Sequence, residues 1–169
     1  MSTSFCISFE GLEGCGKSTQ VELLKSHLQN LGKEVFLFRE PGGTEFGEKL
    51  RKAILEQDSP LNPLAEAHLF ASSRAQLLHE KVLPLLKQEN TVVILDRFVD
   101  SSFAYQGIGR NLGLDLIESI HQSKPLDYRP NLTIYLRLTP DQSLQRQSQR
   151  GNDRDYFEKE KIQFTQKLF

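Results

Sequence analysis

Residues Gly11–Ser18 form the densest group of residues in the chain that could do chemistry. They read Gly-Leu-Glu-Gly-Cys-Gly-Lys-Ser and match the pattern G-x-x-x-x-G-K-[ST] in full. In such a loop the glycines let successive backbone N–H groups turn toward phosphate oxygens, the lysine reaches the terminal phosphates, and the last hydroxyl can hold Mg²⁺. The pattern therefore predicts binding of a nucleoside triphosphate. The residues expected to bind it are Gly11, Leu12, Glu13, Gly14, Cys15, Gly16, Lys17, Ser18 and Thr19.

A second group of candidate residues follows the apolar run Thr91–Leu95. Such a run is typical of a central parallel strand buried on both faces, and Asp96 would stand at its carboxyl end. There its carboxylate can organise a metal ion together with the Ser18 hydroxyl. Arg97 comes next and could bind a phosphate through two parallel hydrogen bonds. An isolated Asp-Arg pair is more commonly a surface ion pair, so the preceding strand is what favours a phosphate site.

The elements around the loop must hold it in place. An apolar run, Phe5–Phe9, predicts a strand before the loop, and Thr19–Leu24 begins a helical pattern after it. This strand–loop–helix order separates a phosphate-binding loop from a chance glycine-rich turn. The loop and the Asp96 group would therefore both extend from carboxyl ends of strands.

Strands and helices alternate along the rest of the chain, which predicts a three-layer α/β fold with a mostly parallel sheet. Gly32 is expected to end the first helix, and Pro84 to kink the longest one. The further expected strands are Glu34–Phe38 and Leu132–Leu138. The further expected helices are Glu45–Glu56, Leu64 to about Lys87, Leu112–Ser123, and one that starts at Thr139-Pro140. The polar segment Gln145–Glu160 is expected to be a mobile surface excursion.

The composition of the chain limits its partners and its setting. Its 169 residues, 38% hydrophobic and 25% charged, predict one globular domain. The net charge of −1 supplies no basic field for nucleic acid. No segment approaches the ~20 apolar residues of a membrane span, and no secretory signal is recognisable at the N-terminus. The two cysteines form no disulfide framework. We therefore expect a cytoplasmic protein without nucleic-acid or membrane partners.

Four motifs in chain order resemble those of bacterial-type thymidylate kinases. They are Phe9–Ser18, Arg39–Thr44, Leu69–Arg74 and Asp96–Gln106, and the resemblance runs from Ser4 to about Glu160. It implies the fold of the P-loop nucleoside monophosphate kinases, with residues 1–169 as one domain. It also implies ATP-dependent phosphorylation of dTMP to dTDP with Mg²⁺, and a homodimer. A guanine-recognition segment, Asn-Lys-x-Asp, is not found, which argues against a GTPase.

The resemblance assigns the recognition of the thymine base to one helix. Phe70 would stack on the ring, and Arg74 would donate a hydrogen bond to its O4. The spacing supports this pairing independently, because residues i and i+4 project from the same face of a helix. Without the other motifs, the two residues would be read as a core phenylalanine and a surface arginine.

The resemblance places the dTMP phosphate on Arg97, with Arg39 and Arg51 as further contributors. Arginines at the latter two positions could equally be solvated residues on a surface. Charge neutralisation during transfer would come from Lys17, from Mg²⁺ on Ser18 and from Arg97.

The remaining implied contacts of the nucleotide come from the Asp96 motif and the phosphate loop. Ser102 and Gln106 would face the polar edge of the pyrimidine. Tyr105 would close the space beside C2′, which would exclude a ribose hydroxyl. Glu13 would lie near the 3′-hydroxyl of the acceptor sugar. A cis peptide bond is implied before Pro41.

A further arginine is expected from a mobile lid at about residues 145–158, because the phosphate loop itself carries none. Arg146, Arg150 and Arg154 are the candidates, and Arg150 and Arg154 are favoured jointly. The lid sequence can be aligned in two ways, and one of them puts Tyr156 at the position of Arg154.

Beyond the lid, the resemblance implies a final edge strand and a last helix that we do not expect in these 169 residues. An alternative hypothesis is therefore a catalytically impaired nucleotide-binding remnant of the same family. A kinase for another nucleoside monophosphate is disfavoured by the set Phe70, Arg74, Tyr105 and Gln106.

Overall fold

A four-stranded parallel sheet forms the centre of the molecule. The structure is a computed structural model, and it describes residues 4–56, 59–150 and 162–168. The strands are β1 (Phe5–Glu10), β2 (Glu34–Arg39), β3 (Thr91–Asp96) and β4 (Leu132–Tyr135), in the order β2-β3-β1-β4. All three pairings are parallel, which confirms the predicted sheet.

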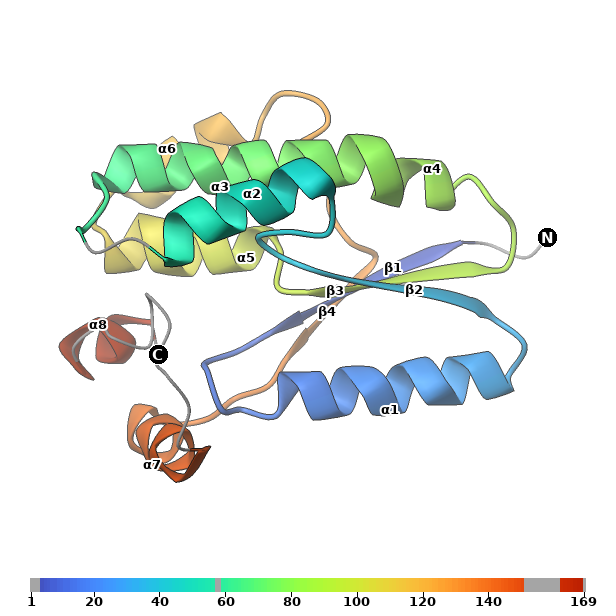
Figure 1. The fold of residues 1–169 in the computed structure, drawn as a ribbon, viewed down its shortest axis with the longest axis horizontal. Helices are drawn as coiled ribbons and strands as arrows, with labels where there is room; N and C mark the ends of the chain where they lie inside the picture. Colours follow the sequence, from blue (N-terminus) through green and yellow to red (C-terminus); the bar gives the residue numbers. More distant parts are fainter. Residues whose placement is uncertain (1–3, 57–58, 151–161, 169) are drawn as a thin grey trace.

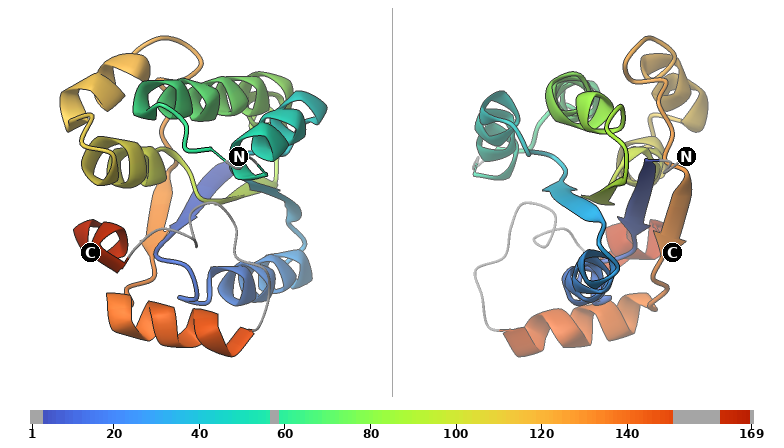
Figure 2. Two further views of the ribbon diagram at one scale, coloured as in Figure 1. Left: turned by 60° about the vertical axis from the view of Figure 1, so that its left-hand side comes forward. Right: turned by 90° about the vertical axis from the view of Figure 1, so that its right-hand side faces the viewer.

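Helices cover both faces of this sheet and complete the predicted three layers. Figure 1 shows α1 on one face, with α2, α3 and α6 on the other. Both views of Figure 2 place α7 on the same side as α1. The α-helices are α1 (Lys17–Asn30), α2 (Glu45–Leu55), α3 (Pro63–Leu77), α4 (Leu83–Leu85), α5 (Val99–Ser102), α6 (Leu114–Ile120), α7 (Pro140–Arg150) and α8 (Ile162–Lys167). Two π-helical segments, η1 (Leu78–Val82) and η2 (Phe103–Gly109), follow α3 and α5.

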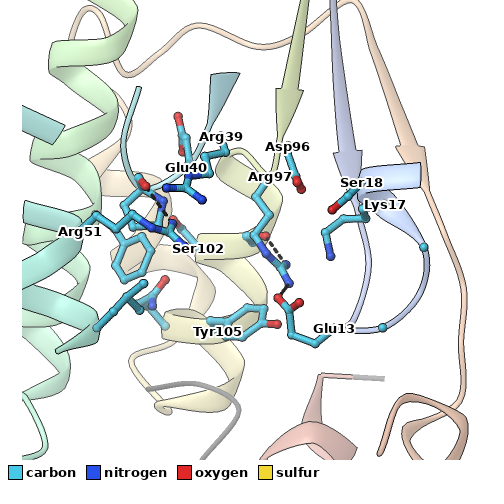
Figure 3. Close-up of a pocket in the computed structure, with 17 residues that line it drawn as sticks. Glu13, Lys17, Ser18, Arg39, Glu40, Arg51, Asp96, Arg97, Ser102 and Tyr105 are labelled. Atoms are coloured by element: carbon cyan, nitrogen blue, oxygen red, sulfur yellow. Dashed lines mark hydrogen bonds and ion pairs between the residues drawn. The ribbon is translucent and has the colours of Figure 1, made fainter. Parts of the chain in front are cut away.

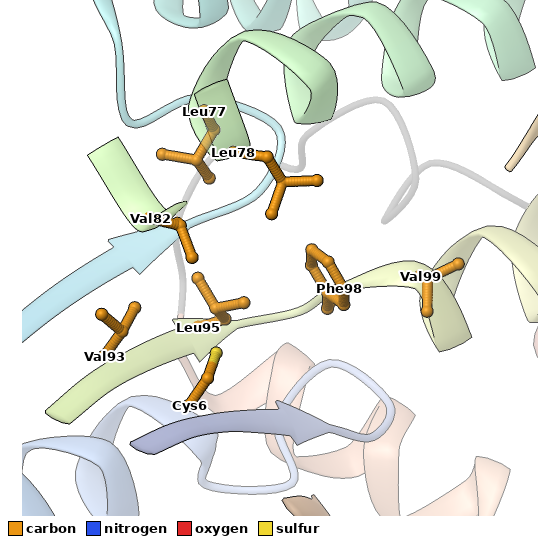
Figure 4. Packing of buried hydrophobic residues seen from close by; sticks show 8 residues of the cluster. All are labelled: Cys6, Leu77, Leu78, Val82, Val93, Leu95, Phe98 and Val99. Carbon is orange, nitrogen blue, oxygen red and sulfur yellow. The ribbon is translucent and has the colours of Figure 1, made fainter. Parts of the chain in front are cut away.

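The alternation of side chains along β1 and β3 divides the core into two clusters. On the face of α3, Cys6, Val93 and Leu95 pack with helix residues and with Phe98 (Figure 4). On the face of α1, Ile7 and Ile94 belong to a second cluster. Because each strand contributes to both clusters, the sheet is clamped between its two helical layers.

Most of the expected element boundaries are confirmed, and the differences have local causes. Gly32 follows α1 with φ 77°, and the Glu40–Pro41 peptide bond is cis, both as expected. The long helical pattern divides at η1, one turn before Pro84. The helix expected over 112–123 starts only at Leu114, because Gly113 has φ 85°, outside the right-handed helical region.

The fourth strand is shorter than expected. It ends at Tyr135 because its partner β1 ends at Glu10, which lies opposite Tyr135 in the ladder. The first part of the expected excursion, 145–150, is the second half of α7. Residues 151–160 lie outside the described residues. Within the described ranges, no helix combines the length and the apolar character needed to cross a membrane.

Candidate active site

A pocket lies at the carboxyl ends of β1, β2 and β3 (Figure 3). In open parallel sheets this edge is the usual place for ligands, because the loops that follow the strands meet there. The pocket is lined by Glu13, Gly14, Gly16, Lys17, Ser18, Arg39, Glu40, Pro41, Arg51, Leu55, Phe70, Asp96, Arg97, Ser101, Ser102, Tyr105 and Gln106. It therefore brings together residues from all four motifs.

The phosphate loop connects β1 to α1, as predicted, and forms one wall of the pocket. Lys17 is buried, and its Nζ donates hydrogen bonds to the carbonyl oxygens of Gly11 at 3.1 Å and Leu12 at 3.3 Å. Burial lowers the pKa of Lys17, and the nearby charge of Arg97 lowers it further. Of the residues predicted to bind the triphosphate, Gly11, Leu12, Cys15 and Thr19 do not line the pocket.

Ser18 and Asp96 offer a hydroxyl and a carboxylate to the same pocket. Both are oxygen ligands, which Mg²⁺ prefers, and Mg²⁺ in nucleotide sites takes few ligands from the protein and the rest from phosphates and water. The described residues hold no cluster of three or more acidic, histidine or cysteine side chains that could bind a metal alone. The pair thus fits a magnesium ion that arrives with a polyphosphate.

Arg97 stands between the phosphate loop and the opposite wall. Its backbone N–H donates to the carbonyl oxygen of Phe9 at 3.0 Å, in a left-handed conformation with φ 71°. Its guanidinium donates to Ser101 Oγ at 3.1 Å and to the carboxylate of Glu13, with which it forms an ion pair. It also lies 5.2 Å from the ring centroid of Tyr105. The guanidinium is thus held on several sides at the centre of the pocket.

Glu10 helps to hold Arg97 in place through Ser101, a role that the sequence did not reveal. Its carboxylate is buried and accepts hydrogen bonds from the Phe98 N–H at 2.8 Å and from Ser101 Oγ at 2.6 Å. Burial raises its pKa, while the charge of Arg97 opposes that shift. Since Ser101 bonds both to Glu10 and to Arg97, the end of β1 helps to fix the arginine that follows β3.

The opposite wall contains two more arginines. Arg51, on α2, donates to the carbonyl oxygen of Pro41 at 3.0 Å. Arg39, at the end of β2, forms an ion pair with Glu48 at 3.6 Å. Both line the pocket, and the Arg39 side chain is also 58% exposed, so binding of a phosphate by these two arginines stays a prediction. With Arg97, three cations border one cavity.

Arg74 lies behind the wall rather than on it. Its side chain is 1% exposed, and its Nη2 lies 2.6 Å from Glu40 Oε2. Its Nη1 donates to Ser102 Oγ at 2.9 Å and reaches His121 Nε2 at 2.7 Å. A surface arginine is therefore wrong, and the expected contact with a base stays a prediction. Phe70, one turn earlier on α3, does line the pocket.

Glu40 was missed by sequence reasoning, although it belongs to one of the quoted motifs. It is 5% exposed, lines the pocket, and its Oε1 has no hydrogen-bond partner among the described residues. Burial raises its pKa against the opposing charge of Arg74. The signal that could have found it is its place directly after β2, at the same edge as the other strand ends.

Ser102, Tyr105 and Gln106 all line the pocket, as expected. They come from α5 and the π-helical segment η2, a type of irregularity that is frequent at functional sites. Gln106 is 1% exposed, and its Nε2 donates to Glu66 Oε1 at 2.7 Å. Glu66 was also missed, although its spacing of four residues from Phe70 on α3 is a detectable signal.

Only part of the expected lid can be described. Arg146, on α7, donates to the carbonyl oxygen of Gly14 at 3.2 Å, and Ser143 Oγ donates to that of Glu13 at 2.7 Å. These contacts place α7 against the phosphate loop. The side chain of Arg150 and the whole of Arg154 lie outside the described residues.

Comparison with known proteins supports the same family as the motifs. The sequence model of the thymidylate kinase family matches residues 9–168. A thymidylate kinase of Thermoanaerobacter sp. (strain X514) is 43% identical over 162 residues, which are 96% of this chain and 78% of the relative. A thymidylate kinase of Chlorobaculum parvum is 48% identical over 140 residues, which are 83% of this chain and 64% of the relative.

A solved structure agrees with the fold as well. The crystal structure of thymidylate kinase from Ehrlichia chaffeensis superposes with a TM-score of 0.76 at 34% sequence identity, covering 85% of this chain and 82% of that one. The residues that the family model matches, 9–168, include the phosphate loop and all the residues that line the pocket. The chain belongs to the thymidylate kinase family of ATP-dependent phosphotransferases.

Proposed function

We propose that this chain transfers the γ-phosphoryl group of ATP to dTMP, which yields dTDP and ADP. One observation carries the proposal: a single pocket is bordered by a phosphate-binding loop on one side and by an aromatic and arginine-rich wall on the other. Such a pocket can hold a nucleoside triphosphate and a second, anionic nucleotide at once. The family supplies the identity of that second nucleotide.

On the donor side, the loop amides and Lys17 hold the β- and γ-phosphates. Lys17 now bonds to two loop carbonyls, and a triphosphate would offer it stronger, charged acceptors. Ser18 and Asp96 would hold Mg²⁺, which supplies charge neutralisation on the phosphates when it is bound. The Glu13 carboxylate lies close enough to Lys17 for its charge to raise the pKa of the lysine, against the effect of burial.

On the acceptor side, Arg97 holds the dTMP phosphate with Arg39 and Arg51. The ion pair of Arg97 with Glu13 shows that the guanidinium already binds an anionic group in this position. The acceptor phosphate would replace that carboxylate, and Glu13 would turn to the 3′-hydroxyl of the sugar. Exchange of one anion for another keeps the charge of Arg97 balanced throughout.

The nucleoside of dTMP lies between Phe70 and the η2 wall. Phe70 stacks on the thymine ring, Tyr105 closes the space beside C2′, and Ser102 and Gln106 face the polar edge. Arg74 reads O4, either directly or by fixing Ser102, to which it donates a hydrogen bond.

The chemical step needs positioning more than acid–base catalysis. A phosphate oxygen of dTMP forms a new bond to the γ-phosphorus, and the bond from that phosphorus to the β,γ-bridging oxygen breaks, with its electron pair leaving on ADP. The acceptor is already an oxyanion, so no strong general base is required. Lys17 and Arg97, together with Arg150 and Arg154 of the 145–158 lid, neutralise the moving charge.

We also propose that the protein works as a cytoplasmic homodimer. The family resemblance supports the dimer, and the two free cysteines, of which Cys6 is buried, suit a reducing compartment.

The test is a coupled ADP-release assay with ATP and Mg²⁺ that compares dTMP, dUMP, UMP and dCMP. We expect turnover with dTMP that clearly exceeds turnover with UMP. The variant Arg97→Ala should lose on the order of 10³-fold in kcat/KM for dTMP, because a charge that stabilises the transition state is removed.

Arg129→Ala is the matched control, since Arg129 is an exposed arginine whose ion pair with Glu118 lies away from the pocket. It should keep the activity of the unchanged protein. A chain that folds and binds ATP but phosphorylates none of the four acceptors would contradict the proposal and leave a nucleotide-binding remnant.

A further inference from the structure

Gln106 presents its amide to the pocket while a buried carboxylate holds it from behind. Its Nε2 donates to Glu66 Oε1 at 2.7 Å. Glu66, on α3, is 0% exposed and does not line the pocket, whereas Gln106 does. The hydrogen bond thus connects Gln106, in the pocket wall on η2, to Glu66 on α3, the helix that also carries Phe70.

Glu66 is paired with a cation. Arg110 follows η2, and its Nε donates a hydrogen bond to Glu66 Oε2 at 3.2 Å, while its Nη2 lies 3.1 Å from the same oxygen. Both oxygens of a carboxylate in an ion pair accept hydrogen bonds. Glu66 is therefore the acceptor both toward Arg110 and toward Gln106.

This property decides which way the amide of Gln106 points. An amide group has a donating and an accepting end, and it can turn over whenever its neighbours allow both orientations. An acceptor-only neighbour allows one orientation, with Nε2 toward Glu66. Within the described residues no donor lies on Oε1 of Gln106, so the oxygen is the end that remains for a ligand.

We propose that Glu66 is a specificity-determining positioning residue that makes this pocket demand a hydrogen-bond donor on the pyrimidine ring. The N3–H of thymine is such a donor. The N3 of cytosine is an acceptor, so its lone pair would face the lone pair of the Gln106 oxygen and the two would repel each other. Glu66 touches no substrate and acts through Gln106 alone. The inference rests on the proposed function, because it takes dTMP as the occupant.

The test compares equilibrium binding of dTMP and 5-methyl-dCMP by calorimetry. These two ligands share the methyl group, sugar and phosphate, and they differ only at the 3,4 edge of the ring. In Glu66→Gln the neighbour of Gln106 can donate as well as accept, so the amide can turn over. We expect the dissociation constant of 5-methyl-dCMP divided by that of dTMP to fall on the order of 10- to 100-fold, mostly through tighter binding of 5-methyl-dCMP.

Two further variants keep this result interpretable. Glu118→Gln makes the same change in an exposed ion pair, with Arg129, and should leave the ratio unchanged. If Glu66→Gln does not fold because Arg110 loses its anion, the double variant Glu66→Gln/Arg110→Met removes both charges and should show the same fall in the ratio. The KM for ATP should stay constant in all of them.

An unchanged ratio in a folded Glu66→Gln chain, or in the folded double variant, would overturn the inference and leave the proposed function intact. If the unchanged protein neither binds nor phosphorylates dTMP, the proposed function itself fails. The binding ratio needs no turnover, and the two failures are therefore distinguished by one set of titrations and one activity assay.

Discussion

His121 accepts a hydrogen bond from the buried Arg74 through a ring nitrogen that carries no proton. Its Nδ1 donates to the carbonyl oxygen of Ile117 at 2.7 Å, which leaves Nε2 to accept from Arg74 at 2.7 Å. Burial, followed by the charge of Arg74, lowers the pKa of His121 to about 4, with Arg129 adding to the shift and Glu118 opposing it. A proton on Nε2 would remove the acceptor and set two cations against each other.

This arrangement predicts an acid-sensitive stability with a defined sign. The pKa of His121 is about 4 in the folded chain, against an ordinary 6.5 when unfolded. Above pH 6.5 both states are neutral and nothing is lost. Between 6.5 and 4 the unfolded chain binds the extra proton, so the free energy of unfolding falls, by about 2 kcal/mol at pH 5. Urea unfolding at pH 7 and pH 5 measures this difference.

The control for the His121 prediction is His121→Gln, whose amide oxygen can accept from Arg74 without titrating. Its free energy of unfolding should fall less between the two pH values. An identical fall in both chains would show that other groups account for the acid sensitivity.

At the scale of elements, a close approach between α2 and the loop after β2 shapes the acceptor side of the pocket. The Gly42 N–H donates to Ser73 Oγ at 3.1 Å, and Thr44 Oγ1 caps α2 by accepting from the Gly47 N–H at 2.9 Å. A Cβ atom added at Gly47 would lie 2.8 Å from the carbonyl oxygen of Gly42. Only a glycine allows the helix to start this close to the loop.

Gly47→Ala should therefore push the Glu40–Thr44 loop away from α2. Because Arg51 is held by the carbonyl oxygen of Pro41, the displacement moves an arginine of the acceptor wall. We expect the KM for dTMP to rise several-fold and the KM for ATP to change little, as measured by initial rates. Lys52→Ala, an exposed change on the same helix, should alter neither value. An equal rise for both substrates would place the damage elsewhere.

At the scale of the whole molecule, the parallel sheet is what gathers distant residues into one site. The strands β1, β2 and β3 end at the same edge, so the phosphate loop, the Arg39 loop and the Arg97 turn meet although they are far apart in the chain. The helices on the two faces hold this edge rigid through the two core clusters.

A graded series at Ile94 tests how far the core alone sets stability. Ile94 is 0% exposed and packs in the cluster on the face of α1. Ile94→Val should cost about 1 kcal/mol in the free energy of unfolding, and Ile94→Ala about 2–5 kcal/mol, because the larger deletion leaves a cavity. Urea denaturation with an unchanged slope would verify this. Equal losses in the two variants would mean that the core collapses around the gap.

The strongest local patterns in the sequence predicted the frame of the molecule. The loop Gly11–Ser18 and the apolar run of β3 were found because each depends on neighbours in the chain, on glycine spacing or on an unbroken hydrophobic run. The π-helical segments were not foreseen, since a π turn inside a helical pattern leaves the periodicity of the apolar residues nearly unchanged.

The sequence predicted most of the residues that line the pocket, but it did not predict the buried residues that hold them in place. Arg97 and Phe70 line the pocket as expected. The buried partners Glu40, Glu66 and His121 were missed, because a polar residue in a helix or turn looks solvated until a tertiary partner far away in sequence is known. Spacing along the chain could have placed Glu40 and Glu66 near the site, but the partners of these residues come from other elements and could not be predicted from it.

The backbone of Arg97 has an evolutionary consequence. With φ 71° it occupies a region that residues with a Cβ atom rarely adopt, at a cost of about 1 kcal/mol or more, and that glycine adopts freely. A glycine here would relieve this strain, but it would also remove the guanidinium with its ion pair to Glu13 and its hydrogen bond to Ser101. The local cost in backbone energy is therefore kept at this position by selection for the side chain and not for the conformation.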